Sequence, residues 1–335
     1  MAREYDESDA RIRPSRRTRP RSKDRPTHED AVDAFVTTVD RGRTTCVTES
    51  GTRITAMKAR ELGPQSVVVG DSIKIVGDLS GREGSLARIV AVNERANSLS
   101  RTIDDAAKVE RTIVSNIDQL VIVCAAANPE PRRGLIDRFL VSAFCEGIEP
   151  IIVVTKTDLA PPPEFIDSYN SLGVTIFSTS ARSGIVETPS LNTLHDLLDG
   201  KVSVLVGHSG VGKSTLINAL VPAAERETGD VNDVTGRGRH TSSSAIALPI
   251  ESRAGGWIID TPGIRAFGLA HFNPQQIIDA FTDLSLVAAT CMTNCSHMGG
   301  GCKLDEWAAP GGVVDERRSA RLTSLRALLN SALNG

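Results

Sequence analysis

One short segment constrains this 335-residue chain more than any other: residues 207–215, with the sequence GHSGVGKST. It follows the apolar run 202–206 and precedes a stretch with a helical pattern. The pattern G-x-x-x-x-G-K-[ST] between a strand and a helix is typical of a phosphate-binding loop. Its glycines let backbone N–H groups turn towards phosphates, its lysine reaches the β and γ oxygens, and its serine can ligate Mg²⁺. We therefore predict a phosphate site made of Gly207, His208, Ser209, Gly210, Val211, Gly212, Lys213, Ser214 and Thr215.

Apolar runs alternate with helical stretches around this loop. Because the runs are continuously apolar, we expect strands buried on both faces, in an α/β layer fold with a parallel sheet. Nucleotides bind at the carboxyl ends of the strands in such folds. The runs lie at 119–124, 150–154, 202–206 and 257–260, and the helical stretches at 134–147 and after Lys213.

Asp260 ends the last of these predicted strands, in the sequence DTPG. Its carboxylate therefore emerges at the same sheet edge as the phosphate loop, where it can hold Mg²⁺ through water. The N–H of Gly263 can then meet a γ-phosphate. Between the two motifs lies the sequence GRGRHT at 236–241, in which Thr241 can complete the metal shell as a mobile switch. A simple turn is the alternative interpretation of DTPG.

Asp158 is the residue that would select guanine. It lies in the sequence TKTD directly after the predicted strand 150–154, and its two oxygens can accept from both N1–H and the 2-amino group of guanine, which adenine does not offer. Further along, the backbone N–H groups of 180–181 can donate to guanine O6. A plain turn between strand and loop is the alternative. We predict a guanine site made of Thr155, Lys156, Thr157, Asp158, Ser180 and Ala181.

The predicted guanine motif precedes the phosphate loop along the chain, whereas in most GTPases it follows the switch. A folded site does not depend on chain order, so this arrangement predicts a circular permutation of one α/β domain. The switch at 260–263 then leads directly into the C-terminal part of the chain. Loss of a γ-phosphate could therefore move that part.

Three of the six cysteines crowd around one histidine in the sequence CMTNCSHMGGGC. In a reducing cytosol such a cluster indicates a metal rather than disulfides, and three thiolates with one imidazole suit a closed, structural zinc site. Metal would also fix a glycine-rich segment that has little apolar material. A set of unrelated thiols is the alternative. The predicted ligands are Cys291, Cys295, His297 and Cys302.

Residues 31–101 have the pattern of a small β-barrel. Five short strands in ~70 residues fit an OB-type barrel, a fold often used to grip single strands or structured RNA. Phe35 is the only aromatic residue in this region, so the barrel lacks the aromatic platforms that would strengthen such a role. The predicted strands lie at 34–39, 44–48, 66–69, 72–76 and 87–92.

The two ends of the chain are rich in arginine. Residues 11–26 hold eight basic residues against the single acid Asp24, so we expect a disordered tail that either engages a polyanion such as RNA or only aids solubility. The last segment, 315–332, is predicted to be a helix capped by Asp315. Its arginines are interpreted as a solvated face, with an RNA-facing one as the alternative: Arg317, Arg318, Arg321 and Arg326.

No leader region is visible at the start, and no run approaches the ~18 apolar residues that span a bilayer. We therefore expect a cytoplasmic protein without a membrane partner.

The barrel, the permuted motif order, the sequences GxSGVGKS and GRHT, and the Cys/His cluster together resemble the ribosome-small-subunit-dependent GTPase A family. The resemblance covers residues 31–335, and the segments 116–118 and 135–141 add to it. This chain departs from the family pattern in three features. Thr155 replaces the usual asparagine, which could loosen the packing of that loop, His208 replaces the more frequent glutamine, and the spacing Cys-x3-Cys-x-His-x4-Cys is tighter.

The resemblance implies a monomeric GTP hydrolase that binds the 30S ribosomal subunit and its 16S rRNA late in subunit assembly and is stimulated by the subunit. It implies Mg²⁺ with GTP and one structural zinc ion per chain. The implied fold is multidomain. A basic tail at 1–30 precedes an OB-type barrel at 31–101, a circularly permuted P-loop GTPase domain at 102–270 and a zinc-binding helical domain at 271–335.

The group that orients the attacking water is the least defined part of the site. Ile264, which follows Gly263, cannot orient water, so we predict slow hydrolysis by the isolated protein. His240 is a candidate replacement, although packing or a phosphate contact explains it equally well. Two other functions stay open: an RNA-binding module in which hydrolysis is incidental, and an ATP-using phosphoryl transferase, which Asp158 disfavours.

Overall fold

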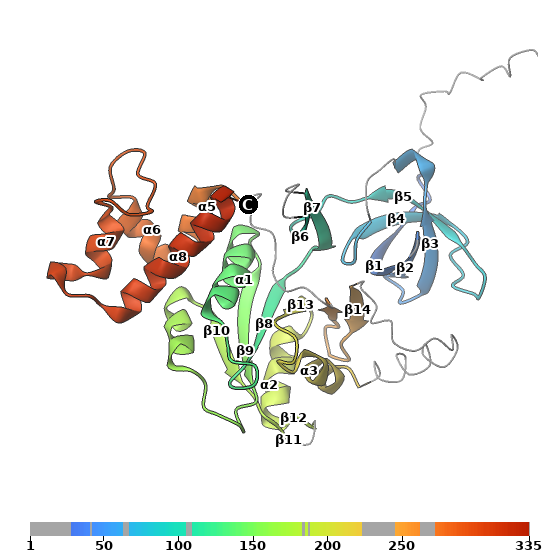
Figure 1. Ribbon diagram of the computed structural model, residues 1–335. Coiled ribbons are helices and arrows are strands. Elements are labelled where there is room, and N and C mark those ends of the chain that lie inside the picture. The colour runs from blue at the N-terminus through green and yellow to red at the C-terminus, as the bar shows by residue number, and fades with distance from the viewer. Residues whose placement is uncertain are drawn as a thin grey trace, which may run out of the picture. The chain divides into compact units, whose positions relative to one another are not determined.

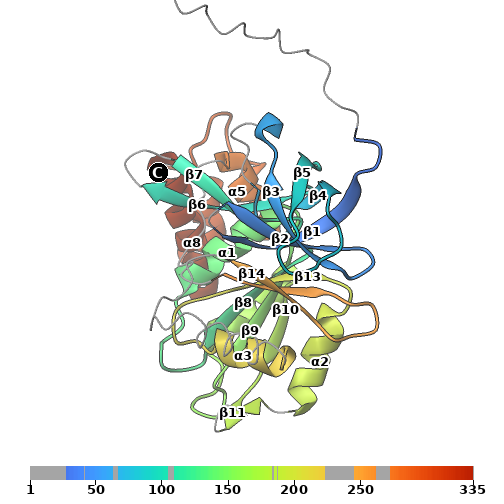
Figure 2. The same ribbon diagram turned by 90° about the vertical axis from the view of Figure 1, so that its right-hand side faces the viewer.

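Figure 1 shows the computed structural model of the chain, which describes residues 28–40, 42–62, 67–104, 109–182, 185–186, 188–222, 245–261 and 272–334. Within these residues, one continuous hydrogen-bonded sheet includes the strands of an N-terminal barrel and those of a central layer. Figure 2 shows the same elements after a quarter turn.

The N-terminal strands form a closed five-stranded barrel, as the sequence predicts. The strands pair in the order β1-β2-β3-β5-β4, and β4 pairs back with β1, so the barrel closes. Alternate side chains fill the interior, and Val36, Ile54 and Ile73 are at most 1% exposed. The strands are β1 (Val32–Asp40), β2 (Arg43–Thr48), β3 (Arg53–Lys58), β4 (Ser72–Gly77) and β5 (Ala87–Val92).

One predicted barrel strand is wrong, and β3 was not predicted. Residues 67–69 form no strand beyond an isolated bridge between Val69 and Val114, because the N–H of Val68 donates to the Asp71 carboxylate at 2.8 Å instead of to a neighbouring strand. Strand β3 alternates buried Ile54 and Ala56 with outward Arg53, Thr55 and Met57. A helical turn, η2 (Arg60–Leu62), follows it.

The central layer consists of five parallel strands with one antiparallel strand beside them, which confirms the predicted α/β fold. Its order is β10-β9-β8-β13-β15-β14, and only β14 runs antiparallel to its neighbour β15. The strands are β8 (Gln119–Ala125), β9 (Glu149–Thr155), β10 (Thr175–Ser178), β13 (Val202–Val206), β14 (Ile246–Pro249) and β15 (Trp257–Asp260).

Helices cover both faces of this sheet (Figure 2). Ile122 of β8 belongs to the core shared with α1 and η3, whereas its neighbour Val123 belongs to the core shared with α2 and α3. The short pair β11 (Ala181–Arg182) and β12 (Ile185–Val186) lies between β10 and α2 along the chain. The helices are α1 (Arg133–Cys145), η3 (Glu164–Leu172), α2 (Thr188–Leu198) and α3 (Lys213–Leu220).

A hairpin that the sequence did not indicate connects the barrel to the central layer: β6 (Ser98–Asp104) and β7 (Val109–Ser115). The fully buried carboxylate of Asp71 accepts two hydrogen bonds from Arg95, at 2.7 and 2.9 Å, and one from the Ser115 hydroxyl at 2.6 Å. Gly70 lies so close to the hairpin that a Cβ there would be 2.0 Å from the Ser115 carbonyl oxygen. The connection is therefore made by a paired buried charge and close backbone packing.

The barrel also pairs directly with the central layer. Thr38 of β1 is opposite Ile246 of β14, and Phe35 of β1 stacks on Trp257 of β15 with ring centroids 5.0 Å apart. Phe35, the one aromatic side chain of the barrel, is thus engaged in internal packing.

The C-terminal helices, orange to red in Figure 1, share a core that also includes Val141 of α1. Helix α8 is the predicted C-terminal helix, and Asp315 caps it as expected, because Oδ1 accepts from the backbone N–H groups of Arg317 and Arg318. No helix in the described ranges is both long and apolar enough to cross a bilayer. The helices are α5 (Pro274–Asp279), α6 (Thr282–Ala288), α7 (Lys303–Ala308), η4 (Pro310–Gly312) and α8 (Glu316–Asn334).

The interpretation of the α8 arginines as a solvated face is wrong for two of the four. Arg321 is 6% exposed, pairs with Asp283 at 3.0 Å and lies over the ring of Phe281. Arg326 pairs with Asp305 at 2.7 Å. Both side chains hold neighbouring helices together, whereas Arg317 and Arg318 are exposed.

Candidate functional site

The predicted phosphate loop connects β13 to α3. Gly207 has a φ of +147°, and a Cβ there would lie 2.2 Å from the carbonyl oxygen of Val123 in β8, so no side chain fits. Gly212, with a φ of +98°, is the N-cap of α3, which directs the first N–H groups of that helix towards the loop. Glycine backbone leading into a helix N-terminus is the arrangement that binds phosphate groups.

Lys213 and Asp260 are two charged groups beside the phosphate loop at this edge of the sheet. Nζ of Lys213 donates to the carbonyl oxygens of Gly207 at 2.8 Å and His208 at 2.9 Å. The pKa of Lys213 is lowered because the side chain is partly buried, although the charge of Asp260 opposes this shift. The pKa of Asp260 is raised for the same reason, and the charge of Lys213 opposes that shift. Both charges are therefore partly removed from water and stabilise one another, a pattern common at functional sites.

The two segments predicted to bind guanine lie side by side. The N–H of Thr179 donates to the carbonyl oxygen of Val154 at 2.8 Å, and the N–H of Thr157 donates to the carbonyl oxygen of Thr179 at 3.4 Å. These bonds place the turn 155–158 beside Ser180, which is 6% exposed, and beside Ala181, the first residue of β11. Asp158 is exposed at the end of this turn.

Thr155 joins the turn to the phosphate loop. Its hydroxyl oxygen lies 2.5 Å from the carbonyl oxygen of Val211 and 3.2 Å from that of Cys124. A Cβ on Gly212 would lie 3.6 Å from the same hydroxyl, an ordinary van der Waals distance. The threonine therefore packs closely between the two loops.

Asn128, in the loop after β8, was not identified from the sequence. Its carbonyl oxygen accepts a hydrogen bond from Nζ of Lys156, whose backbone has a φ of +58°. Pro129 next to it lies 3.9 Å from the position of a Cβ on Gly210. The available signal was an Asn-Pro turn after a buried strand that ends at this edge of the sheet.

Two parts of the predicted switch, His240 with Thr241 and Gly263 with Ile264, lie outside the described residues. Ser214, the second residue of α3, is described and exposed.

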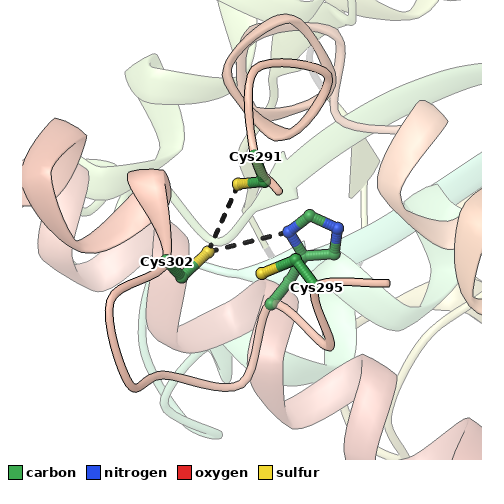
Figure 3. A group of neighbouring side chains, drawn as sticks. Cys291, Cys295 and Cys302 are labelled. Atoms are coloured by element: carbon green, nitrogen blue, oxygen red, sulfur yellow. Dashed lines mark hydrogen bonds between the residues drawn. The ribbon is translucent and has the colours of Figure 1, made fainter. Parts of the chain in front are cut away.

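Cys291, Cys295, His297 and Cys302 come together, with one ligand atom of each within 4.8 Å of all the others. Figure 3 shows the three cysteine sulfurs converging, with Sγ of Cys302 3.7 Å from Sγ of Cys291 and 3.6 Å from Nδ1 of His297. Disulfide sulfurs lie ~2 Å apart, whereas thiolates bound tetrahedrally at ~2.3 Å lie ~3.8 Å apart. The cluster can therefore hold a metal ion.

Helix α8 supports the cluster. Nε of Arg326 donates to the carbonyl oxygen of His297 at 2.9 Å, and the same guanidinium pairs with Asp305 of α7. Burial, and secondly the Arg326 charge, lower the pKa of His297 and favour the neutral imidazole that a metal requires. His297 has a φ of +59°, so the loop is turned sharply at this ligand.

Comparison with known proteins gives a consistent result. The RsgA GTPase family model matches residues 92–270. Over 274 residues the chain is 35% identical to the small ribosomal subunit biogenesis GTPase RsgA of Alcanivorax borkumensis, covering 79% of this chain and 74% of that relative.

Two solved structures are also similar. YjeQ from Thermotoga maritima is 25% identical, with a TM-score of 0.64 over 90% of this chain and 99% of that one. YloQ, described as a circularly permuted GTPase, is 22% identical, with a TM-score of 0.63 over 92% of this chain and 98% of that one. The second likeness concerns the fold, and it agrees with the permuted strand order.

Proposed function

Because this chain belongs to the RsgA GTPase family, and is therefore a GTP hydrolase, we propose that it hydrolyses GTP on the 30S ribosomal subunit during late assembly and is stimulated by that subunit. The name of the relative from A. borkumensis supports the assembly role. One structural observation carries the proposal. The phosphate loop and the guanine turn, which lie far apart along the chain, meet at one edge of the sheet through Thr155 and Val211.

The phosphate half of the site binds the nucleotide through residues 207–215. The backbone N–H groups of the loop and of the first turn of α3 hold the phosphates, and Lys213 turns from the loop carbonyls to the β and γ oxygens. Its lowered pKa supports this, since a buried ammonium gains most from an anionic partner.

The guanine half binds the base through residues 155–158 and 180–181. Asp158 accepts from N1–H and the 2-amino group, the Lys156 stem lies over the base, and the backbone at Ser180 and Ala181 donates to O6. The exposure of Asp158 next to this backbone supports that assignment.

Ser214, Asp260, Thr241 and the N–H of Gly263 are proposed to surround Mg²⁺ and the γ-phosphate. The exposed hydroxyl of Ser214 beside the loop and the carboxylate of Asp260 at the end of β15 are oxygen donors of the kind Mg²⁺ prefers. Mg²⁺ held by these residues would neutralise charge on the nucleotide phosphates. His240 remains our candidate for orienting the attacking water.

The metal of the C-terminal cluster is proposed to be one structural zinc ion, bound by Cys291, Cys295, His297 and Cys302. Three sulfurs and one nitrogen with no further ligand position form the donor set that structural zinc prefers, and the sulfur spacing fits it. The ion would hold the glycine-rich loop against α7 and α8.

Further proposals concern the whole molecule. We propose a cytoplasmic monomer whose tail (1–30), barrel (31–101) and C-terminal domain (271–335) contact 16S rRNA, and whose GTPase domain spans residues 102–270. Loss of the γ-phosphate relaxes the switch that leads into the C-terminal domain and weakens the hold on the subunit.

GTP turnover measured with and without saturating 30S subunits tests the proposal. We expect slow turnover by the isolated protein and a rise of ~10³- to 10⁵-fold, the range that ordering partners give other GTPases. Lys213→Ala serves as the inactive control for contaminating nucleotidases. Turnover unaffected by the subunits, with equal subunit affinity in the GDP and GTP-analogue states, would contradict it.

A further inference from the structure

Strand β1 belongs to two parts of the molecule at once. Along one edge it pairs with β4 of the barrel over residues 32–35 and then with β14 of the central layer at Thr38. Along the other edge its pairing with β2 shifts register between Val36 and Thr38. Such a bulge bends a strand and increases its twist, so it turns β1 from the barrel towards the central layer.

The side chains of β1 are divided in the same way. Ala34 and Val36 belong to the core of the barrel, whereas Phe35 packs against the central core that contains Ile259 of β15. The ring of Phe35 stacks on that of Trp257, with centroids 5.0 Å apart and 29° between the ring planes. Stacked aromatic pairs add a preferred geometry to ordinary apolar packing. The barrel therefore contributes an aromatic side chain to the packing of β15.

A single cross-strand row leads from the barrel to Asp260. Thr38 is opposite Ile246, and Ile246 is opposite Asp260. On its other side Asp260 is opposite Leu205 of β13, and the phosphate loop begins two residues after Leu205. Because neighbouring strands lie ~4.8 Å apart, the backbone of Thr38 is ~10 Å from that of Asp260. The barrel strand is therefore joined to the phosphate edge of the sheet through β14 and β15.

The two sides of β15 are supported differently. On the β13 side, the hydroxyl of Thr261, a residue that is 2% exposed, donates to the carbonyl oxygen of Leu205 at 3.0 Å. On the other side lies β14, a strand of four residues, and β1 comes next in the sheet. Without β1, β14 would be an edge strand with unpaired backbone groups. The support of β15 on this side therefore depends on the barrel.

We infer that Phe35 and Trp257 are positioning residues for GTP hydrolysis, through which the barrel holds β15 so that the Asp260 carboxylate stays at the metal. They act through Asp260 and not on the substrate. A catalytic group has to be held within ~0.5 Å of its productive place, and a misplacement of ~1 Å can cost ~10²-fold in rate. The inference rests on the proposed function for the role of Asp260. It implies that the barrel supports hydrolysis in the isolated chain, before any subunit is bound.

The first test compares three variants of the isolated full chain. Phe35→Leu removes the ring but keeps an apolar side chain, and Phe35→Tyr keeps the ring. The matched control is Phe165→Leu, which removes another aromatic contact of the same core, the edge-on pair of Phe165 with Tyr169 at 6.5 Å. This control accounts for a general loss of stability. Since no subunits are present, contacts of the barrel with RNA do not enter the measurement.

We expect Phe35→Leu to hydrolyse bound GTP about five- to tenfold more slowly in single turnover, and to need roughly threefold more Mg²⁺ for its half-maximal rate. Its affinity for a GTP analogue should fall in Mg²⁺ but equal that of the wild type in excess EDTA, because the phosphate loop and the guanine turn are unchanged. Phe35→Tyr and Phe165→Leu should stay within about twofold of the wild type in each measurement.

A second test leaves the stack intact and observes it directly. Trp257 and Trp307 are the two tryptophans of the chain, so Trp307→Phe leaves Trp257 as the one intrinsic fluorophore. At saturating nucleotide in Mg²⁺, the emission of Trp257 should differ between the GDP state and the GTP-analogue state. Chelation of Mg²⁺ should remove the difference, and so should Asp260→Asn in the same background.

A wild-type hydrolysis rate and Mg²⁺ requirement in Phe35→Leu, an equal loss in Phe165→Leu, or the same Trp257 emission in both nucleotide states overturns the inference. A loss of analogue affinity in EDTA as large as in Mg²⁺ overturns it too, because the ring would then act on the whole nucleotide site. A wild type that hydrolyses no GTP, or an Asp260→Asn variant with an unchanged Mg²⁺ requirement, contradicts the proposed function instead, which separates the two failures.

Discussion

The phenol of Tyr169 donates a 2.7 Å hydrogen bond to Oδ1 of Asp137, and both side chains are at most 1% exposed. Asp137 lies on α1, and Tyr169 lies in η3. Burial raises the pKa of Asp137 above its ordinary 3.8, although the hydrogen bonds from Ser324 and Tyr169 oppose the rise. A titratable group thus lies within the packing of α1, η3 and α8.

This pair predicts a pH-dependent stability. Since the folded protein binds the Asp137 proton more tightly than the unfolded chain, stability falls as the pH rises from about 3.8 through the raised folded-state pKa. Asp137→Asn carries no such proton, so its melting temperature relative to wild type should increase across that window and then level off. Tyr169→Phe removes a hydrogen bond that lowers the pKa, so it should move the window upwards. Melting temperatures of the wild type, Asp137→Asn and Tyr169→Phe, measured between pH 4 and pH 8 in steps of about one pH unit, check this pH dependence. The opposite trend would contradict the assignment.

Asp158→Asn should exchange guanine for xanthine, because the amide donates where the carboxylate accepts and the 2-oxo group of xanthine wants a donor. We expect GDP affinity to fall by ~10²- to 10⁴-fold and xanthosine diphosphate affinity to rise, as measured by direct titration. Asp167→Asn, an exposed carboxylate on η3, is the control and should bind GDP like wild type. Unchanged GDP binding by Asp158→Asn would remove the guanine assignment.

Ser214→Ala should separate metal binding from phosphate binding. The hydroxyl is exposed, so the substitution should change stability by less than ~0.5 kcal/mol. GTP-analogue affinity in Mg²⁺ should fall, whereas affinity in excess EDTA should equal that of wild type. A loss of the same size in both buffers would show that Ser214 acts on the phosphates and not on the metal.

Arg326→Gln should loosen the metal centre without removing a ligand. The substitution breaks the contacts to the His297 carbonyl and to Asp305, and partners of this kind are worth ~10- to 100-fold in metal affinity. Zinc transfer from Arg326→Gln to a competing chelator should therefore be faster and more complete than zinc transfer from Arg317→Gln. The control variant Arg317→Gln removes an arginine that is exposed on the same helix. Freshly purified wild type without stoichiometric zinc would contradict the zinc assignment altogether.

The phosphate loop and the strands around the proposed nucleotide site could be predicted because each motif is local. The sequence 207–215 encodes its own turn and helix cap, and short apolar runs mark β9, β13 and β15, with Ser203 as the one polar interruption in β13. The same holds for the metal cluster, whose four ligands lie within twelve residues.

What could not be predicted depends on pairs distant in sequence. The tie of Thr155 to Val211 joins segments 56 residues apart, and nothing local to either residue announces it. Asp71 looks like an ordinary turn residue, yet its carboxylate is buried against Arg95 and against Ser115, which ends a hairpin that was not anticipated. Arg321 and Arg326 looked like solvent-facing charges until their carboxylate partners, Asp283 and Asp305, were placed opposite them.

The pairing of Thr38 with Ile246 has a consequence for the making of this protein. A nascent chain that has completed its barrel at Val92 still lacks β14, the strand of the central layer that pairs with β1, because β14 begins only at Ile246. The strands that carry the proposed guanine turn are likewise complete before β13, which adds to the free edge of β8 and is covered by β15 only later. Both halves of the proposed nucleotide site have been made once synthesis passes residue 215, but Asp260 at the end of β15 is still missing. Such distant contacts also form slowly, so we expect the complete proposed site to assemble only after synthesis has passed β15.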